Sequence, residues 1–180
     1  MNIVFFGSSQ FAVPSLRALI TAQHKVSCVV TQPDRQKGRG LRLEGTMVKA
    51  VAEESGLEFY QPDRINTSQA LRFLKDKNAD LFVVIAYGQI LSKGILGIPK
   101  IFSLNVHASL LPLYRGAAPI NWAIINGETK TGITVIKIAQ HLDAGPIILQ
   151  ETIDISGDDT AITLEDRLSQ MAAQRLLESI

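Results

Sequence analysis

The sequence predicts an α/β protein with a mostly parallel central sheet, helices on both faces and a late antiparallel strand. Short apolar runs alternate with helical patterns through the first hundred residues, which is typical of βαβ units. The last two strand-like segments have no helix between them, so we expect them to pair antiparallel. With 180 residues, 46% of them hydrophobic and 19% charged, the chain has the size and composition of one globular domain.

The elements of the first half follow from local patterns, taken in chain order. The apolar run Asn2–Phe6 ends at Gly7 and predicts a buried strand, and apolar residues at helical spacing predict a helix over Val13–Ala22. The β-branched segment Lys25–Thr31 predicts a second strand, and a glycine-containing basic loop follows from Gln32 to about Gly45. Similar patterns predict helices at Thr46–Ser55 and Ser68–Lys77 and strands at Leu57–Tyr60 and Asp80–Ala86.

The second half begins with a turn or short helix after Tyr87-Gly88, and a strand is predicted at Phe102–Val106. Pro112 and Gly116 mark a loop that starts at His107. Apolar and polar residues then alternate on both sides of a turn, which predicts a strand pair, and an amphipathic pattern predicts a last helix. The remaining elements are expected at Ala118–Asn126 (helix), Gly132–Ala139 and Ile147–Ile155 (strands) and Thr163–Ser179 (helix).

Composition excludes several classes of protein. The formal net charge of +1 gives, by itself, no reason to expect a nucleic-acid partner. A single cysteine, Cys28, excludes an internal disulfide framework and a multi-cysteine metal site, and its apolar surroundings favour a buried thiol. No apolar run approaches the ~20 residues of a membrane span, and the start MNIVFFG has no basic segment or cleavage site. We therefore expect a cytoplasmic protein that does not bind membranes.

Ligands of such a sheet collect beyond the carboxyl ends of its strands, and three segments lie there. The first, Gly7–Phe11, has one glycine where a dinucleotide fingerprint needs three, so we interpret it as a tight turn. The other two are Ala86–Leu91 and the loop that begins at His107.

The strongest group of polar residues lies at the start of that loop. Asn105 and His107 share one side of an extended strand because side chains alternate, so a carboxamide and an imidazole project together into the expected cleft. Such a pair can donate hydrogen bonds to an oxyanion, and the imidazole can move a proton near neutral pH. If the segment around Asp143 folds beside His107, its carboxylate would orient the imidazole. The three residues would then suit acyl or formyl transfer without a covalent enzyme intermediate.

Spacing alone leaves other interpretations open. A polar cluster with a purely structural role is as well supported as a catalytic one. Ser109 is a weaker candidate nucleophile because it lacks the G-x-S-x-G turn. His107, His141 and Asp143 have the side chains of a metal-ligand set. Neither histidine belongs to an H-E-x-x-H motif, however, and we expect no metal.

Residues 105–116, NVHASLLPLYRG, resemble the N10-formyltetrahydrofolate-dependent formyltransferases. The resemblance spans the whole chain. Within this superfamily, Thr31-Gln32-Pro33-Asp34-Arg35 followed by Gly38-Arg39-Gly40 is most similar to the members that act on initiator methionyl-tRNA. Further matching segments are Ala117–Ile120, Asn126–Glu128, Thr131–Thr134 and Asp143–Gly145.

The resemblance implies a Rossmann-like formyltransferase fold, with residues 1–180 as the catalytic domain and without the C-terminal barrel domain of the family. It implies transfer of the formyl group of 10-formyltetrahydrofolate to the methionine amino group of initiator methionyl-tRNA, for translation initiation, without a metal. We also expect a monomer. The catalytic residues would be Asn105, His107 and Asp143. Folate would bind Ser109, Leu110, Leu111 and Pro112 and the backbone of Ile85, Ala86, Tyr87, Gly88, Gln89 and Ile90, and tRNA would bind Arg35, Lys37, Arg39 and Arg42.

The basic loop concentrates charge that the overall balance hides. Residues 34–49 hold five basic side chains against two acidic ones, a local charge of +3. A solvated surface loop is the alternative to a tRNA-binding segment.

Two alternative functions also remain. The catalytic pattern fits a formyltransferase that acts on a small amine such as an amino-sugar nucleotide. Glycinamide ribonucleotide is a weaker candidate, because the first turn lacks a glycine-rich phosphate cradle. The other alternative is a non-catalytic folate- or RNA-binding module, against which the intact Asn105, His107 and Asp143 argue.

Overall fold

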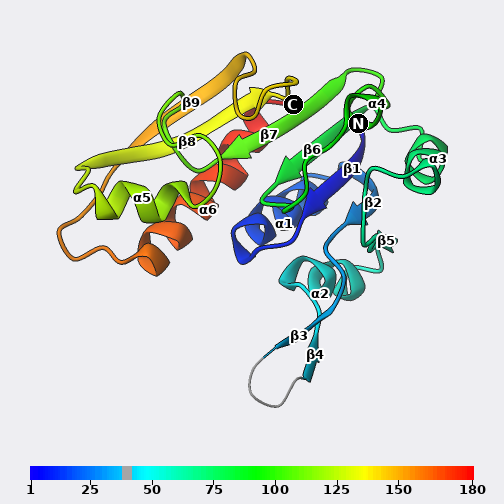
Figure 1. Ribbon diagram of the computed structural model, residues 1–180, viewed down its shortest axis with the longest axis horizontal. Coiled ribbons are helices and arrows are strands. Elements are labelled where there is room, and N and C mark those ends of the chain that lie inside the picture. Colours follow the sequence, from blue (N-terminus) through cyan, green and yellow to red (C-terminus); the bar gives the residue numbers. More distant parts are fainter. Residues whose placement is uncertain (38–41) are drawn as a thin grey trace.

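The computed structural model describes residues 1–37 and 42–180 and is built on a seven-stranded sheet (Figure 1). The strand order is β5-β2-β1-β6-β7-β8-β9. The strands from β5 to β7 pair in parallel, whereas β8 pairs antiparallel with both β7 and β9. The predicted mostly parallel sheet with a late antiparallel addition is therefore confirmed. The strands are β1 (Asn2–Gly7), β2 (Lys25–Val30), β5 (Phe59–Tyr60), β6 (Leu81–Ile85), β7 (Phe102–His107), β8 (Lys130–Lys137) and β9 (Ile147–Asp154).

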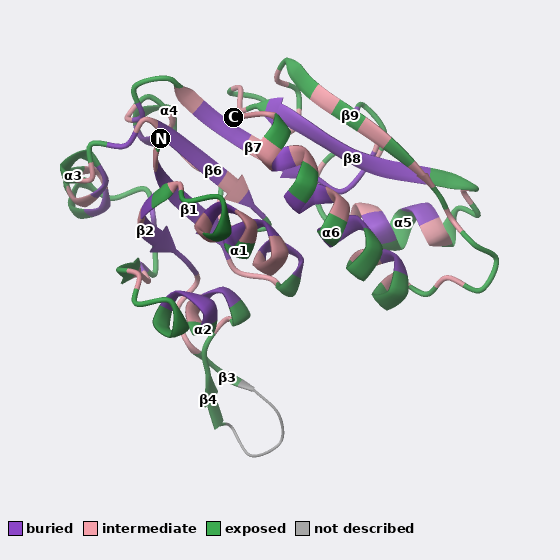
Figure 2. Ribbon diagram, turned by 180° about the vertical axis from the view of Figure 1, so that it is seen from behind, coloured by how far each residue is buried: buried purple, intermediate pink, exposed green. Residues whose placement is uncertain are grey.

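Helices cover both faces of this sheet, as the α/β pattern predicts. One buried cluster joins the sheet to α1 (Val13–Thr21), α2 (Met47–Glu54), α5 (Pro119–Ile125) and α6 (Ala161–Glu178). A second cluster packs α3 (Ser68–Asp76) and α4 (Lys93–Leu96) against the other face. Figure 2 shows the central strands buried and the helices buried along one side only. A short 3-10 helix, η1 (Gln10–Ala12), precedes α1 and was not predicted.

Threonine side chains define three helix starts. Thr46 and Thr67 accept hydrogen bonds from the backbone N–H groups of Lys49 and Ala70 and so cap α2 and α3. Thr160 forms a capping box with Thr163, which is why α6 begins earlier than its apolar periodicity suggests.

The segment predicted as a basic loop contains a β-hairpin. β3 (Arg35–Lys37) pairs antiparallel with β4 (Arg42–Glu44), and the hairpin extends away from the sheet (Figure 1). The prediction was wrong here because a solvent-exposed hairpin needs no apolar alternation, and β4 is exposed along its whole length.

Cys28 lies in the core, as predicted. Its side chain is fully buried, and this burial raises the pKa of the thiol to about 12. The thiol is therefore protonated at neutral pH and is no nucleophile. No helix in the described part of the chain is long and apolar enough to cross a membrane.

Gly132 in β8 permits a close approach between strand β9 and the loop after β7. A Cβ atom at this position would lie 1.9 Å from the backbone oxygen of Glu151 and 2.6 Å from the Leu110 side chain. We expect Gly132→Ala to lower the free energy of unfolding by about 3 kcal/mol, measured by urea denaturation, because backbone must move. Gly157→Ala is the control, since nothing lies within 4 Å of its added Cβ, and it should change stability by less than about 0.5 kcal/mol. Equal unfolding midpoints for the two variants would contradict this packing.

Candidate active site

A cavity of about 720 Å³ opens at the carboxyl ends of β1, β6 and β7. Ser9 and Phe11 line it after β1, residues 86–91 line it after β6, and residues 105–108 line it at the end of β7. The start of α5 and the loop after β8 complete the wall. The cavity thus lies where ligands of parallel sheets collect, and all three predicted strand ends contribute to it.

The Asp143 carboxylate brings the three predicted catalytic residues together. Its Oδ1 accepts a hydrogen bond from Asn105 Nδ2 at 3.1 Å. Its Oδ2 accepts one from the backbone N–H of Gly116 at 2.9 Å and lies 3.6 Å from His107 Nδ1. The last distance is longer than that of a hydrogen bond. Asn105 and His107 therefore project from the same side of β7, as strand alternation predicts.

His107 has a defined ring orientation. Its side chain is 9% exposed, and its Nε2 lies 2.9 Å from the backbone oxygen of Tyr114. Because a carbonyl oxygen only accepts hydrogen bonds, Nε2 carries a hydrogen and donates a hydrogen bond to the Tyr114 backbone oxygen. The other ring nitrogen, Nδ1, faces Asp143.

The loop that carries Asp143 is an excursion from the β8–β9 hairpin. Lys137 N–H donates to Pro146 O at 3.0 Å and closes the base of the loop. Gly145 is required there, because a Cβ would lie 1.7 Å from the Lys137 oxygen. Asp143 itself has a φ of 46°, a left-handed conformation that turns its side chain toward β7.

The segment Ser109–Pro112 supports the end of β7 and does not line the cavity. The buried Thr134 hydroxyl donates to Ser109 O at 2.6 Å and accepts from Leu111 N at 3.1 Å. Ser109 is fully buried, and its hydroxyl donates to Leu113 O at 2.6 Å, so it is held away from any nucleophilic role. Contact of Ser109, Leu110, Leu111 and Pro112 with folate stays a prediction.

The turn that follows β6 forms one wall of the cavity. Residues 86–90 line it, whereas Ile85, the last residue of β6, is buried in the core. The Tyr87 ring packs edge-on against the Phe6 ring, with 5.5 Å between the ring centroids, in the buried cluster that also contains α3 and α4. The turn itself is left-handed at Ala86 and Gly88.

Sequence patterns missed several groups in and around the cavity. The backbone N–H of Gly116 and the carbonyl of Tyr114 bind Asp143 and His107, but backbone groups leave no signal in side-chain motifs. Phe11 and Leu142 give the cavity apolar surface, and Glu165 reaches it from α6. His141 lines the cavity, yet among the described residues no three His, Cys, Asp or Glu side chains are grouped to hold a metal ion.

The structure describes part of the predicted tRNA-binding segment. Arg35 and Arg42 are exposed on β3 and β4, and Lys37 is the register partner of Arg42. Arg39 lies outside the described residues. The described basic residues therefore lie on the hairpin and away from the cavity wall.

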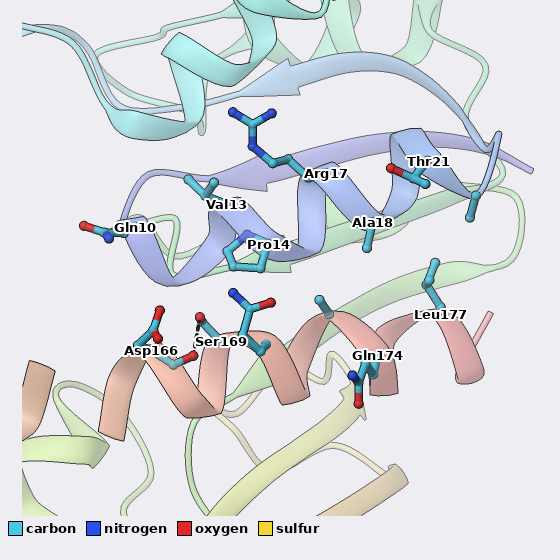
Figure 3. A pocket seen from close by; sticks show the side chains of 13 residues that line it. Gln10, Val13, Pro14, Arg17, Ala18, Thr21, Asp166, Ser169, Gln174 and Leu177 are labelled. Atoms are coloured by element: carbon cyan, nitrogen blue, oxygen red, sulfur yellow. Dashed lines mark hydrogen bonds between the residues drawn. The ribbon is translucent and has the colours of Figure 1, made fainter. Parts of the chain in front are cut away.

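A second cavity of about 700 Å³ lies between α1 and α6 (Figure 3). Two of its polar side chains have hydrogen-bond partners: Arg17 donates to Glu54 at 2.7 Å, and the Ser169 hydroxyl donates to Asp166 O at 2.7 Å. None of the predicted site residues lines it. The cavity at the strand ends is therefore the candidate active site.

Comparison with known sequences identifies relatives over the whole chain. The chain is 50% identical over 179 residues to the methionyl-tRNA formyltransferase of Thermodesulfovibrio yellowstonii, covering 99% of this chain and 58% of that protein. It is 48% identical over 180 residues to the methionyl-tRNA formyltransferase of Citrifermentans bemidjiense, covering 100% of this chain and 57% of that protein. The chain thus spans less than two thirds of the length of these relatives.

Solved structures share the fold. Phosphoribosylglycinamide formyltransferase from Bacillus halodurans aligns with a TM-score of 0.83 at 22% identity, over 99% of this chain and 93% of that one. A sugar N-formyltransferase from Shewanella sp. FDAARGOS_354 aligns with a TM-score of 0.71 at 17% identity, over 99% and 67% of the two chains. The sequence model of the formyl transferase family matches residues 1–180, and the chain belongs to this family.

Proposed function

We propose that this chain catalyses transfer of the formyl group of 10-formyltetrahydrofolate to the α-amino group of methionine on initiator methionyl-tRNA. The observation that carries the proposal is the meeting of Asn105, His107 and Asp143 at one wall of a cavity of about 720 Å³. This volume suits a small-molecule substrate. The acceptor is proposed from relatives named methionyl-tRNA formyltransferase at 50% and 48% identity. The reaction would serve translation initiation in the cytoplasm.

The geometry suits direct attack of the neutral amine on the formyl carbon. Formation of the new C–N bond places negative charge on the formyl oxygen. Collapse of this tetrahedral intermediate then breaks the bond between the formyl carbon and N10 of the folate. Asn105 Nδ2 carries two hydrogens. One of them is hydrogen-bonded to Asp143, so the other can donate a hydrogen bond to this oxyanion. The proton lost by the amine must reach N10. His107 Nδ1, facing the Asp143 carboxylate, is the group that relays it.

The acceptor is tested by assaying the complete gene product with 10-formyltetrahydrofolate and three amines. We expect formyl transfer to charged initiator methionyl-tRNA at a kcat/KM at least 100-fold above that for an amino-sugar nucleotide or for free methionine. Transfer to the sugar nucleotide without transfer to the tRNA would assign the small-amine function. Folate binding without transfer to any amine would assign a non-catalytic module.

Removing the Asp143 charge should impair chemistry without unfolding the protein. We expect Asp143→Asn and Asn105→Ala each to lower kcat by about 10²- to 10³-fold, the range seen when one oxyanion or proton-transfer group is lost. Asp166→Asn, on an exposed position of α6, is the matched control and should retain parental kcat. Near-parental turnover by a folded Asn105 or Asp143 variant would remove that residue from the mechanism.

The exposed arginines of the β3–β4 hairpin should contribute to tRNA binding. We expect the double variant Arg35→Ala/Arg42→Ala to raise the KM for tRNA about 10-fold and to reduce the slope of log affinity against log salt by about 2, with an unchanged KM for folate. The sequence predicts the same direction for Arg39→Ala. Arg72→Ala, exposed on α3, is the control. An unchanged salt slope in the double variant would show that the hairpin is only a solvated surface element.

A further inference from the structure

Gln32 lies between the base of the β3–β4 hairpin and the cavity wall, and it bonds to three segments that are distant in sequence. Its backbone N–H donates to Ser8 Oγ at 3.1 Å. Its backbone oxygen accepts from Gln61 Nε2 at 2.9 Å. Its side-chain Nε2 donates to Tyr87 O at 3.1 Å. Gln32 is therefore held at its backbone while its carboxamide reaches the turn after β6.

Hydrogen bonds to the Tyr87 carbonyl hold the turn after β6 on the side that faces the hairpin. It accepts from Gln32 Nε2 and also from Ser8 Oγ, at 2.9 Å. The residues on either side, Ala86 and Gly88, have φ values of 46° and 91°. A left-handed conformation at a non-glycine residue is costly and persists only where tertiary contacts hold it. A Cβ on Gly88 would lie 3.6 Å from Gln32 Nε2, so the carboxamide also lies over this residue.

A second carboxamide holds the turn from the other side. Gln89 Oε1 accepts from Ile65 N at 2.9 Å, and Gln89 Nε2 lies 3.4 Å from Pro62 O. The Gln89 bonds link the turn after β6 to Pro62 and Ile65. Gln32, by contrast, precedes strand β3 of the hairpin in the chain.

The hairpin base gives Gln32 a rigid support. Gln61 Nε2 bridges Gln32 O and Asp34 Oδ1, the latter at 2.7 Å, and Lys49 Nζ lies 2.5 Å from Asp34 Oδ2. The hydrogen bonds from Gln61 and Lys49 lower the pKa of Asp34, so this carboxyl stays charged at neutral pH. None of these supporting bonds uses the Gln32 side chain, so they survive its truncation.

We propose that Gln32 is a positioning residue, which orients the Ala86–Gly88 turn through the Tyr87 carbonyl and thereby shapes the folate-binding wall. The identity of the ligand rests on the proposed function. The role of Gln32 in holding the wall rests on its own hydrogen bonds.

The test compares Gln32→Ala and Gln32→Glu with the parent in the complete gene product, by steady-state kinetics with both substrates varied. Gln32→Ala should raise the KM for 10-formyltetrahydrofolate about 5-fold, the value of one hydrogen bond, with kcat and the tRNA KM within about 2-fold of the parent. Gln32→Glu has the same shape but points an acceptor oxygen at Tyr87 O, so it should raise the folate KM further. Gln69→Ala, exposed on α3, should change neither constant.

A rise in the folate KM without a rise in the tRNA KM distinguishes a positioning role of Gln32 from general destabilisation of the protein. Folded variants with a parental folate KM would overturn the inference, as would equal losses in kcat and in both substrate affinities. Calorimetric binding of tetrahydrofolate, which needs no tRNA, tests Gln32 independently of the acceptor. A parent that binds tetrahydrofolate 5-fold more tightly than Gln32→Ala but fails to formylate methionyl-tRNA would refute the proposed function and uphold the inference.

Discussion

The site depends on one carboxylate that is nearly excluded from water. The Asp143 side chain is 8% exposed, and a charge in such a place is unfavourable unless hydrogen bonds and charge partners compensate for lost hydration. Asn105, the Gly116 backbone and the His107 ring supply that compensation from two separate segments. The same contacts therefore stabilise the charge and hold the end of β7, the loop before α5 and the loop after β8 together. Removing the Asp143 carboxylate leaves all three partners without their common point of attachment.

Backbone strain concentrates around this cavity. Six non-glycine residues in the described ranges have positive φ, and four of them lie in the segments that surround the cavity. The other two, Gln23 and Asn78, follow helices, where a left-handed residue is a common way to end the helix. Strain of this kind survives where the surrounding structure holds it, as hydrogen bonds do at Tyr87 and Asp143. The four cavity-side residues are Ala86, Tyr114, Ala118 and Asp143.

Local patterns predicted the elements that bury apolar surface and the strand end at which Asn105 and His107 lie. The buried run of β6 and the shared side of Asn105 and His107 follow from strand periodicity, which is a local property. The position of Ser109–Pro112 was beyond such reasoning, because it depends on Thr134 and Gln150, which lie on later strands. The contribution of backbone groups and the hairpin within the basic segment were missed for a related reason. Neither leaves a periodic or chemical signature in the side chains.

The projecting hairpin has a consequence for how such a chain can diverge. Arg35, Arg42, Leu43 and Glu44 are all exposed, and none belongs to either buried cluster. Substitutions on these residues therefore change the outer surface without removing core contacts, so selection can alter them at little cost in folding stability. The polar groups around Asp143 have no such freedom, since each contacts Asp143 from another segment. The outer surface of the hairpin and the strand-end site can thus diverge at different rates within the same chain.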